Sequence, residues 1–302
     1  MILTVTPNCA LDVTYTVDAL RPDTVHRVRE IRRRAGGKGI NVARVLHAVG
    51  ARTLAVGTAG GAAGDEFTRE LRKADLPGEL VPIAGETRRT TTVLSTTDNA
   101  VTLFNEPGPE LDTREWAAFV DAVRGLVGSA DVLVCSGSLP PGAPVDGYAE
   151  LLGLADGIPT VLDTSGEALR AGLAGRPSVV KPNAEELFEA TGLAEPIEAA
   201  ANLCGAGVGA VLVSLGPEGL LACTESGVWQ AKPSAPLSGN STGAGDAAVA
   251  GIALELARGG CWPDVVRRAV ALSCAAVLGP LAGDVDLDHY LRELPAVRVQ
   301  RP

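Results

Sequence analysis

Residues 241–251 read Ser-Thr-Gly-Ala-Gly-Asp-Ala-Ala-Val-Ala-Gly, a turn of small residues that continues into an alanine-rich segment ending near Arg258. This order predicts a helix that is reached through glycines and carries one carboxylate, Asp246, in its first turn. The first amide groups of a helix lack intrachain acceptors and are partly positive, so a glycine turn there lets an anion approach the backbone. A carboxylate would repel that anion unless it takes a proton from the nucleophile that attacks it. The stretch therefore indicates either an ordinary helix cap or the cradle and general base of a phosphoryl transfer.

A second glycine cluster, Ala-Gly-Gly-Lys-Gly-Ile-Asn at 35–41, precedes a segment, 42–49, whose apolar positions follow helical spacing. Lys38 stands among residues with almost no side chain, so its ammonium group and the neighbouring amides can meet a polar ligand together. Asn41 adds hydrogen-bond donors and acceptors. A phosphate or a polyol fits this arrangement, and a surface turn with a solvated lysine fits it too. A Walker A loop is excluded because the GxxxxGK[ST] spacing is missing.

Four short apolar runs in the middle of the chain each end in polar or small residues, and helical stretches separate them. The runs are 131–135, 160–162, 178–180 and 210–213, and the helical stretches are 145–155, 166–173, 184–191 and 196–204. This alternation predicts an α/β fold whose mainly parallel sheet is covered by helices on both faces. In such sheets ligands bind at the carboxyl ends of the strands, where the polar residues of this chain gather. No repeat or low-complexity linker divides the chain, so we expect one domain over 1–302.

The composition argues against several classes of partner. A formal net charge of -10 and a pI near 4.9 disfavour nucleic acid, which demands a basic surface. The six cysteines lack metal-binding spacing and are expected to be the reduced thiols of a cytoplasmic protein. We expect no export signal and no membrane span, because the chain opens on the strand-like stretch 1–6 and nowhere runs eighteen apolar residues together. A dinucleotide-dependent oxidoreductase would carry GxGxxG after the first strand. This chain has Pro-Asn-Cys-Ala at 7–10 instead, which argues against that class of enzyme.

The two glycine clusters together resemble the two motifs of the ribokinase-like (PfkB) family of carbohydrate kinases. Further similar stretches follow in family order: MILTVTPN at 1–8, GETRRT at 85–90, SGSLPPG at 136–142, LDTSGEAL at 162–169, VKPNAEEL at 180–187 and VSLGPEG at 213–219. Within the family the combination looks like the branch of 1-phosphofructokinase, tagatose-6-phosphate kinase and the minor bacterial 6-phosphofructokinase. The resemblance implies a three-layer ribokinase-like fold and an ATP-dependent phosphotransferase with an alcohol group as acceptor.

Two extended regions, 12–34 and 88–105, interrupt the α/β pattern, and the second turns at Thr97-Asp98-Asn99 as a hairpin would. The resemblance implies that they join as a small β-sheet lid over the sugar site. A lid excludes water and so prevents hydrolysis of the nucleotide in the absence of the sugar. In this family such lids often pair between subunits, which implies a homodimer.

The resemblance also assigns site residues. Asp246 would be the catalytic base, with Gly243, Ala244 and Gly245 as the anion cradle. The hexose phosphate would be bound by Asp12, Gly37, Lys38, Asn41, Arg88 and Ser138, with Arg27 as a helper. The nucleotide would be bound by Lys181, Asn183, Ser214, Gly216 and Gly219. Glu186 would hold Mg²⁺ through water, although Asn183 and Glu186 also have the spacing of a helix capping box, and a K⁺ requirement stays open.

The residues before Gly108 bear on the substrate. Some relatives carry a lysine or arginine there, whereas this chain has Leu-Phe-Asn-Glu-Pro at 103–107. The absence of a lysine or arginine at this place fits a 1-phosphofructokinase, which converts fructose 1-phosphate to fructose 1,6-bisphosphate. The opening 1–8 and Asp-Thr-Val at 23–25 look similar to tagatose-6-phosphate kinases, which leaves a 6-phosphate acceptor phosphorylated at C1 as the alternative. A kinase of unphosphorylated sugars and a catalytically silent sugar-binding regulator are the remaining alternatives.

Overall fold

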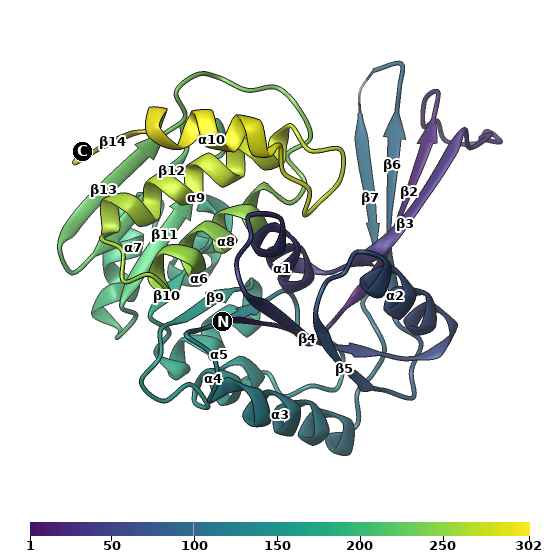
Figure 1. The fold of residues 1–302 in the computed structure, drawn as a ribbon, viewed down its shortest axis with the longest axis horizontal. Coiled ribbons are helices and arrows are strands. Elements are labelled where there is room, and N and C mark those ends of the chain that lie inside the picture. The colour runs from purple at the N-terminus through teal and green to yellow at the C-terminus, as the bar shows by residue number, and fades with distance from the viewer. Residues whose placement is uncertain (99) are drawn as a thin grey trace.

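The structure of the chain, a computed structural model, describes residues 1–98 and 100–302. Its centre is a ten-stranded sheet in the order β14-β13-β12-β11-β10-β9-β8-β1-β4-β5 (Figure 1). The strands from β5 to β11 in that order are parallel, and β12, β13 and β14 add to one edge antiparallel. Their bounds are β1 Ile2–Thr6, β4 Thr53–Ala59, β5 Gly78–Pro82, β8 Val132–Ser136, β9 Thr160–Asp163, β10 Val179–Val180, β11 Ala210–Ser214, β12 Leu220–Thr224, β13 Gly227–Lys232 and β14 Arg298–Gln300.

Helices cover both faces of this sheet, because central strands such as β1 and β8 are buried along their whole length and leave no solvent face. One face carries α1 Lys38–Ala48, α8 Ala244–Leu256, α9 Trp262–Val277 and α10 Leu287–Ala296. The other carries α3 Thr113–Val127, α4 Gly147–Leu152, α5 Gly166–Gly172, α6 Ala184–Thr191 and α7 Pro196–Gly205. The predicted α/β fold with a mainly parallel sheet is confirmed.

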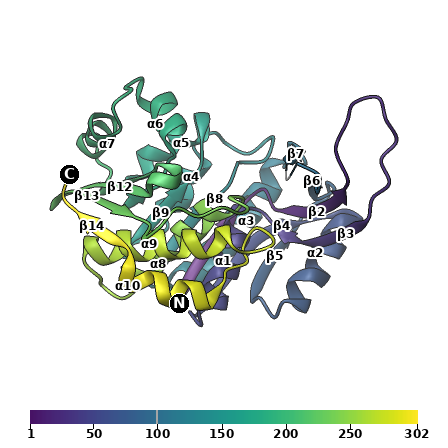
Figure 2. The same cartoon turned by 90° about the horizontal axis from the view of Figure 1, so that it is seen from above.

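A separate four-stranded sheet, the small sheet, has the order β3-β2-β6-β7. Its strands are β2 Ala10–Val17, β3 Glu30–Gly36, β6 Arg88–Ser95 and β7 Val101–Asn105, and α2 Gly61–Lys73 packs beside β2 and β3. It projects from the body of the molecule (Figure 1), and the segment between β2 and β3, in purple, extends beyond it (Figure 2). The two extended regions predicted from the sequence supply these strands. Asn99 of the predicted turn lies outside the described residues.

Helix α1 begins four residues before the segment that the apolar spacing predicts, at Lys38 rather than Val42. Its N-cap is Gly37, whose φ of 103° is open to glycine and strained for other residues. The first turn carries Lys38 and Asn41, so it shows no apolar pattern in the sequence. The α8 turn is built alike, since Gly243 is the N-cap with φ 87° and Asp246 lies in the first turn.

Two further expectations concern the cysteines and membrane-spanning helices. All six cysteines are unpaired in the structure. Within residues 1–98 and 100–302, no helix is both long enough and apolar enough to cross a bilayer.

Candidate active site

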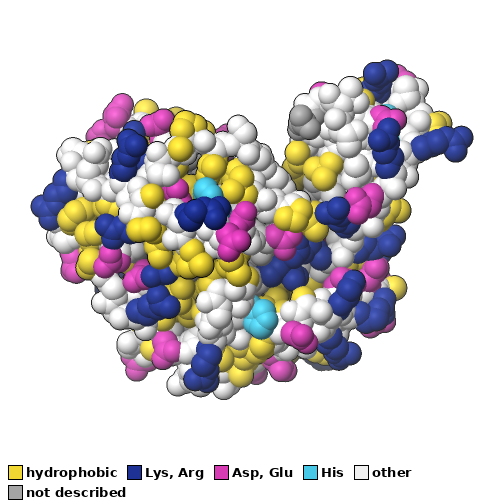
Figure 3. Space-filling view, turned by 45° about the horizontal axis from the view of Figure 1, so that its top comes forward, with side chains coloured by type: hydrophobic (Ala, Val, Ile, Leu, Met, Phe, Trp, Pro, Cys, Tyr) yellow, Lys and Arg dark blue, Asp and Glu magenta, His cyan; other side chains and the backbone are white. Residues whose placement is uncertain are grey.

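A cavity of about 770 Å³ opens at the carboxyl ends of the parallel strands, between the body and the small sheet. The space-filling view shows the notch between the body and the projecting small sheet (Figure 3). The strand ends, the N-termini of α1 and α8 and the small sheet all contribute to its wall. Of the residues predicted for a site, these line it: Asp12, Gly37, Lys38, Asn41, Arg88, Ser138, Lys181, Asn183, Glu186, Ser214, Gly243, Gly245 and Asp246.

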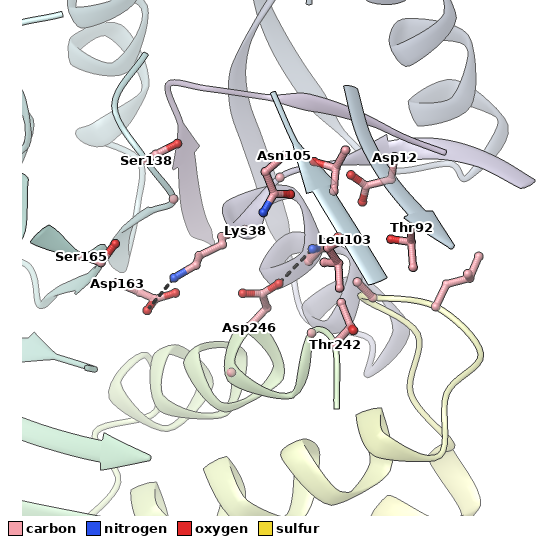
Figure 4. Close-up of a pocket in the computed structure, with 18 of the residues that line it drawn as sticks. Asp12, Lys38, Thr92, Leu103, Asn105, Ser138, Asp163, Ser165, Thr242 and Asp246 are labelled. Atoms are coloured by element: carbon pink, nitrogen blue, oxygen red, sulfur yellow. Dashed lines mark hydrogen bonds and ion pairs between the residues drawn. The ribbon is translucent and has the colours of Figure 1, made fainter. Parts of the chain in front are cut away.

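Asp246 lies in the first turn of α8 and is 7 % exposed. The side-chain amide of Asn41 donates to its Oδ2 at 2.9 Å, and Figure 4 shows Asp246 facing into the cavity. Burial, and next the negative charge of Asp163, raise the pKa of Asp246 to about 7, against the opposing effects of Lys38, Asn41 and Lys181. A carboxyl group with a pKa near neutrality can accept and release a proton at physiological pH.

The backbone around Asp246 forms the predicted anion cradle only in part. The Ala244 amide donates to the carbonyl of Ser241 at 3.1 Å, so it is engaged inside the turn. The amides of Gly245 and Asp246 are the next in the first turn, where a helix offers no intrahelical acceptor. An added Cβ at Gly243 would stand 2.8 Å from the Cα of Ala282, so the loop after α9 closes directly over this turn.

Two lysines meet one buried carboxylate on the cavity floor. Oδ1 of Asp163, at the end of β9, lies 3.2 Å from Nζ of Lys181. It lies 3.6 Å from Nζ of Lys38, the contact drawn as a dashed line in Figure 4. Burial by itself raises the pKa of Asp163, but the two lysines outweigh burial and hold it below its usual range. The same contact, above all, raises the pKa of Lys38. Sequence reasoning did not select Asp163 as a site residue, although polar residues at strand ends were the available signal.

Asn183 and Glu186 form the capping box of α6. Asn183 Oδ1 accepts from the Glu186 amide at 2.8 Å, and Glu186 Oε2 accepts from the Asn183 amide at 2.9 Å. Both residues also line the cavity. The same two side chains therefore cap the helix and lie where a nucleotide and Mg²⁺ are predicted to bind. The cap uses only Oε2, which leaves Oε1 able to face a hydrated cation. Among the described residues no three acidic, histidine or cysteine side chains gather into a metal cage, and a Mg²⁺ ion shared with substrate phosphates needs only one or two carboxylates.

The small sheet brings Asp12 and Arg88 to the other end of the cavity. Arg88 donates to the carbonyls of Asn8 at 3.3 Å and Glu106 at 3.2 Å, which fixes the guanidinium at the base of the small sheet. Burial raises the pKa of Asp12 to about 6, although the nearby Arg34 and Arg88 oppose that rise. This end of the cavity therefore offers a carboxylate that hydroxyl groups can donate to, beside a guanidinium that an anion can pair with.

Arg34 lines the cavity as well and was not predicted. It makes a bidentate ion pair with Asp284, at 3.0 Å for both contacts, and so joins β3 to the loop after α9 across 250 positions of sequence. It lies opposite Asp12 in the β2–β3 register, a pairing that the structure shows and no local pattern of the sequence indicates.

Other predicted site residues occupy different places. Ser138 lines the cavity, and the side-chain amide of Asn8 donates to its Oγ at 3.0 Å. Gly216 begins the short 3-10 turn Gly216–Glu218 after β11, and Gly219 follows it. Neither glycine lines the cavity, whereas Ser214 does. Arg27 is exposed in the segment between β2 and β3 and does not line the cavity formed by this chain. The roles of Gly216, Gly219 and Arg27 stay predictions.

Comparisons with known proteins identify the family of the chain. A model of the pfkB family carbohydrate kinases matches residues 4–288. The structure resembles phosphofructokinase-2 from Escherichia coli in complex with potassium, with a TM-score of 0.92, 32 % identity and coverage of 97 % of this chain and 98 % of that one. The same enzyme in complex with fructose-6-phosphate gives a TM-score of 0.90 at 31 % identity over 97 % and 98 % of the chains. A possible 1-phosphofructokinase from Thermotoga maritima gives 0.89 at 27 % identity over 100 % and 99 %. The chain therefore belongs to the pfkB family of carbohydrate kinases.

Proposed function

We propose that this kinase transfers the γ-phosphoryl group of ATP to a hexose phosphate, and that its substrate is fructose 1-phosphate, which becomes fructose 1,6-bisphosphate. The observation that carries the proposal is the cavity itself. A buried carboxylate with a pKa near 7, Asp246, stands between a pair of lysines and an end that holds Asp12 and Arg88.

The transfer is proposed to run in line. Asp246 takes the proton of the acceptor hydroxyl as its oxygen attacks the γ-phosphorus, and ADP leaves on the opposite side. The free amides of Gly245 and Asp246 and the ammonium of Lys181 stabilise charge on the transferring oxygens. Asn41 holds Oδ2 of Asp246, so that Oδ1 faces the acceptor.

Glu186 and Asn183 are the residues proposed to face Mg²⁺ beside the phosphates. When bound, the ion supplies positive charge to the β- and γ-phosphate oxygens. Lys181 and Lys38 supply the charge that belongs to the protein itself. A potassium requirement stays a prediction, to be tested by comparing turnover in potassium and sodium salts.

The small sheet is proposed to act as the lid of a single domain spanning 1–302. Asp12 then receives hydrogen bonds from sugar hydroxyls while Arg88 pairs with the sugar phosphate. Exposed apolar side chains on its strands, Ile31, Val101, Leu103 and Phe104, suit a homodimer that pairs the two small sheets. Escherichia coli phosphofructokinase-2 has a tetrameric inhibited form. Light scattering on the intact chain tests this, because the mass of a single chain at micromolar concentration would refute it.

Leu103 favours fructose 1-phosphate over a 6-phosphate. It lines the cavity at the place where some relatives carry a basic residue, so the side chain at this position supplies no cation for a phosphate. The second candidate, phosphorylation of fructose 6-phosphate or tagatose 6-phosphate at C1, is favoured by the similarity to the Escherichia coli enzyme in complex with fructose-6-phosphate.

The test is the release of ADP from Mg-ATP with fructose 1-phosphate, tagatose 6-phosphate, fructose 6-phosphate and the same sugars without phosphate. We expect the highest kcat/KM with fructose 1-phosphate. A higher value with a 6-phosphate would establish the second candidate. Turnover only with free sugars would refute the phosphosugar proposal, and no turnover with any sugar would mean a silent sugar-binding protein.

A further inference from the structure

Asp163 is the most enclosed charged group of the cavity, since its side chain is 1 % exposed. Its Oδ2 accepts a hydrogen bond from Ser136 Oγ at 3.0 Å, which fixes the plane of the carboxylate. Its Oδ1 has no hydrogen bond of good geometry within the described residues and faces the two ammonium groups instead. A buried carboxylate without such partners would be costly, so the two lysines are what makes its charge tolerable.

The two lysines differ in their freedom. The side chain of Lys181 is 5 % exposed, whereas that of Lys38 is 40 % exposed and reaches Asp163 from the first turn of α1. A flexible side chain of this kind takes one position only when a partner holds it, because a lysine carries four rotatable bonds. For both ammonium groups, Asp163 is the ion-pair partner within the described part of the chain.

The charged groups facing Asp246 come from three elements besides its own helix. Lys38 belongs to α1, Lys181 follows β10, and Asp163 ends β9, while the neutral Asn41 of α1 donates the hydrogen bond described above. Asp163 is the like charge in this group.

We infer that Asp163 is a positioning residue of the phosphoryl transfer: it anchors the ammonium groups of Lys38 and Lys181 on the cavity floor. The inference rests on the proposed function. The incoming phosphate thus meets two ammonium groups already in place, so the transfer needs no rearrangement of charge at the moment of reaction.

The first test is Asp163→Asn, which keeps the size of the side chain and removes its charge. We expect kcat at pH 8 to fall about 10- to 100-fold, since small misplacements of catalytic groups cost up to that factor. The acid limb of the pH–kcat profile should move down by about one pH unit, because Asp246 loses a like-charged neighbour and keeps both cations. Ser136→Ala retains the charge and should leave the position of that limb in place. An Asp163→Asn enzyme with an unmoved acid limb and normal kcat would overturn the inference.

The second test does not need turnover. Acetic anhydride at pH 8 modifies the unprotonated amine, and peptide mass spectrometry reports the rate at each lysine. In Asp163→Asn the rate at Lys38 should rise about tenfold or more, because one pKa unit changes the free-amine fraction tenfold. Lys73, which is 77 % exposed and far from Asp163 in sequence, is the internal control. An unchanged ratio of the rates at Lys38 and Lys73 would refute the anchoring role even in a protein that turns over no sugar.

The two tests separate failure of the inference from failure of the proposed function, because only the first depends on catalysis. Removing one partner of a buried ion pair can prevent folding, whereas replacing both is often tolerated. If circular dichroism shows that Asp163→Asn is unfolded, the same comparisons are made between Lys181→Met and Lys181→Met/Asp163→Asn. The double variant should again show faster modification of Lys38, and the acid limb of its pH–kcat profile should lie at lower pH. Equal behaviour of the two proteins would overturn the inference.

Discussion

Replacing Asp246 by asparagine should remove most of the activity and yet stabilise the protein above neutral pH. The folded carboxyl has a pKa of about 7 because it is buried and next because Asp163 lies near, whereas its ordinary value is 3.8. Between those pH values the folded protein holds a proton that the unfolded chain has released. The free energy of unfolding of the wild type therefore falls as pH rises through this window and levels off above about 7.

The size of this effect follows from the pKa difference. A pKa difference of about 3 units, at about 1.36 kcal/mol per unit, corresponds to about 4 kcal/mol. The wild type loses this amount of its free energy of unfolding between about pH 4 and pH 7.5. Asp246→Asn has no proton to titrate at this position and does not lose it. Relative to wild type, Asp246→Asn should therefore gain about 4 kcal/mol of stability over that range. Above about pH 7, where the wild-type carboxyl is ionised, turnover of Asp246→Asn should be about three decades below wild type, because loss of a general base costs about two to four.

Urea unfolding of both proteins at pH 4.5 and pH 8 measures the difference, with equal m-values as the check that the unfolded states are comparable. Turnover is measured as ADP release with the best acceptor, and ATP binding is measured by calorimetry. Asp246→Asn should bind ATP as the wild type does. A stability difference that is the same at both pH values would refute the perturbed pKa. Near-normal turnover of Asp246→Asn would refute its role as the base.

Three further predictions concern the two ends of the cavity. Arg88→Ala should raise KM for the phosphosugar about 10- to 100-fold, because a hydrogen bond to a charged group contributes about 1.5–3 kcal/mol, while KM for ATP stays the same; weaker ATP with an unaltered sugar KM would contradict the placement of Arg88. Leu103→Lys should move the kcat/KM ratio toward 6-phosphates several-fold, and an unchanged ratio across the acceptor panel would show that no phosphate lies beside this position. Gly243→Ala should abolish turnover and lower the urea midpoint, because its Cβ would stand 2.8 Å from Ala282 Cα. The control Gly259→Ala, also at positive φ but with open space around it, should lose only the backbone strain of about 1–2 kcal/mol from the free energy of unfolding. Equal losses of stability in the two variants would show that the loop after α9 does not constrain position 243.

The sequence predicted the elements best where local signals agree. The predicted helix 184–191 matches α6 at both ends, because Asn183 caps its start and Gly192 ends it in the left-handed conformation. The start of α1 was placed too late because Lys38 and Asn41 of the first turn line the cavity, which leaves Ile40 as its single large apolar residue. The antiparallel edge strands β12–β14 were not predicted, since their pairing depends on partners as far apart as Ala231 and Val299.

For the site, the sequence predicted residue types at strand and helix ends better than it predicted their pairing. Asp246 and Lys181 were predicted, but the contact that joins Lys181 to Asp163 depends on the order of parallel strands. The ion pair between Arg34 and Asp284 likewise spans 250 positions, and neither residue has a local pattern. A single sequence shows which charges exist, whereas the sheet order decides which of them face one another.

The hydrogen bond from Asn41 to Asp246 spans 205 positions, and this span has a consequence for how the enzyme is made. During synthesis the first glycine turn leaves the ribosome long before the second, so a growing chain carries Lys38 and Asn41 but neither the base nor the cradle. Bringing such distant segments together is a late and slow event in folding. An unfinished chain therefore cannot waste ATP, and the appearance of turnover during refolding would report the docking of α8 against α1.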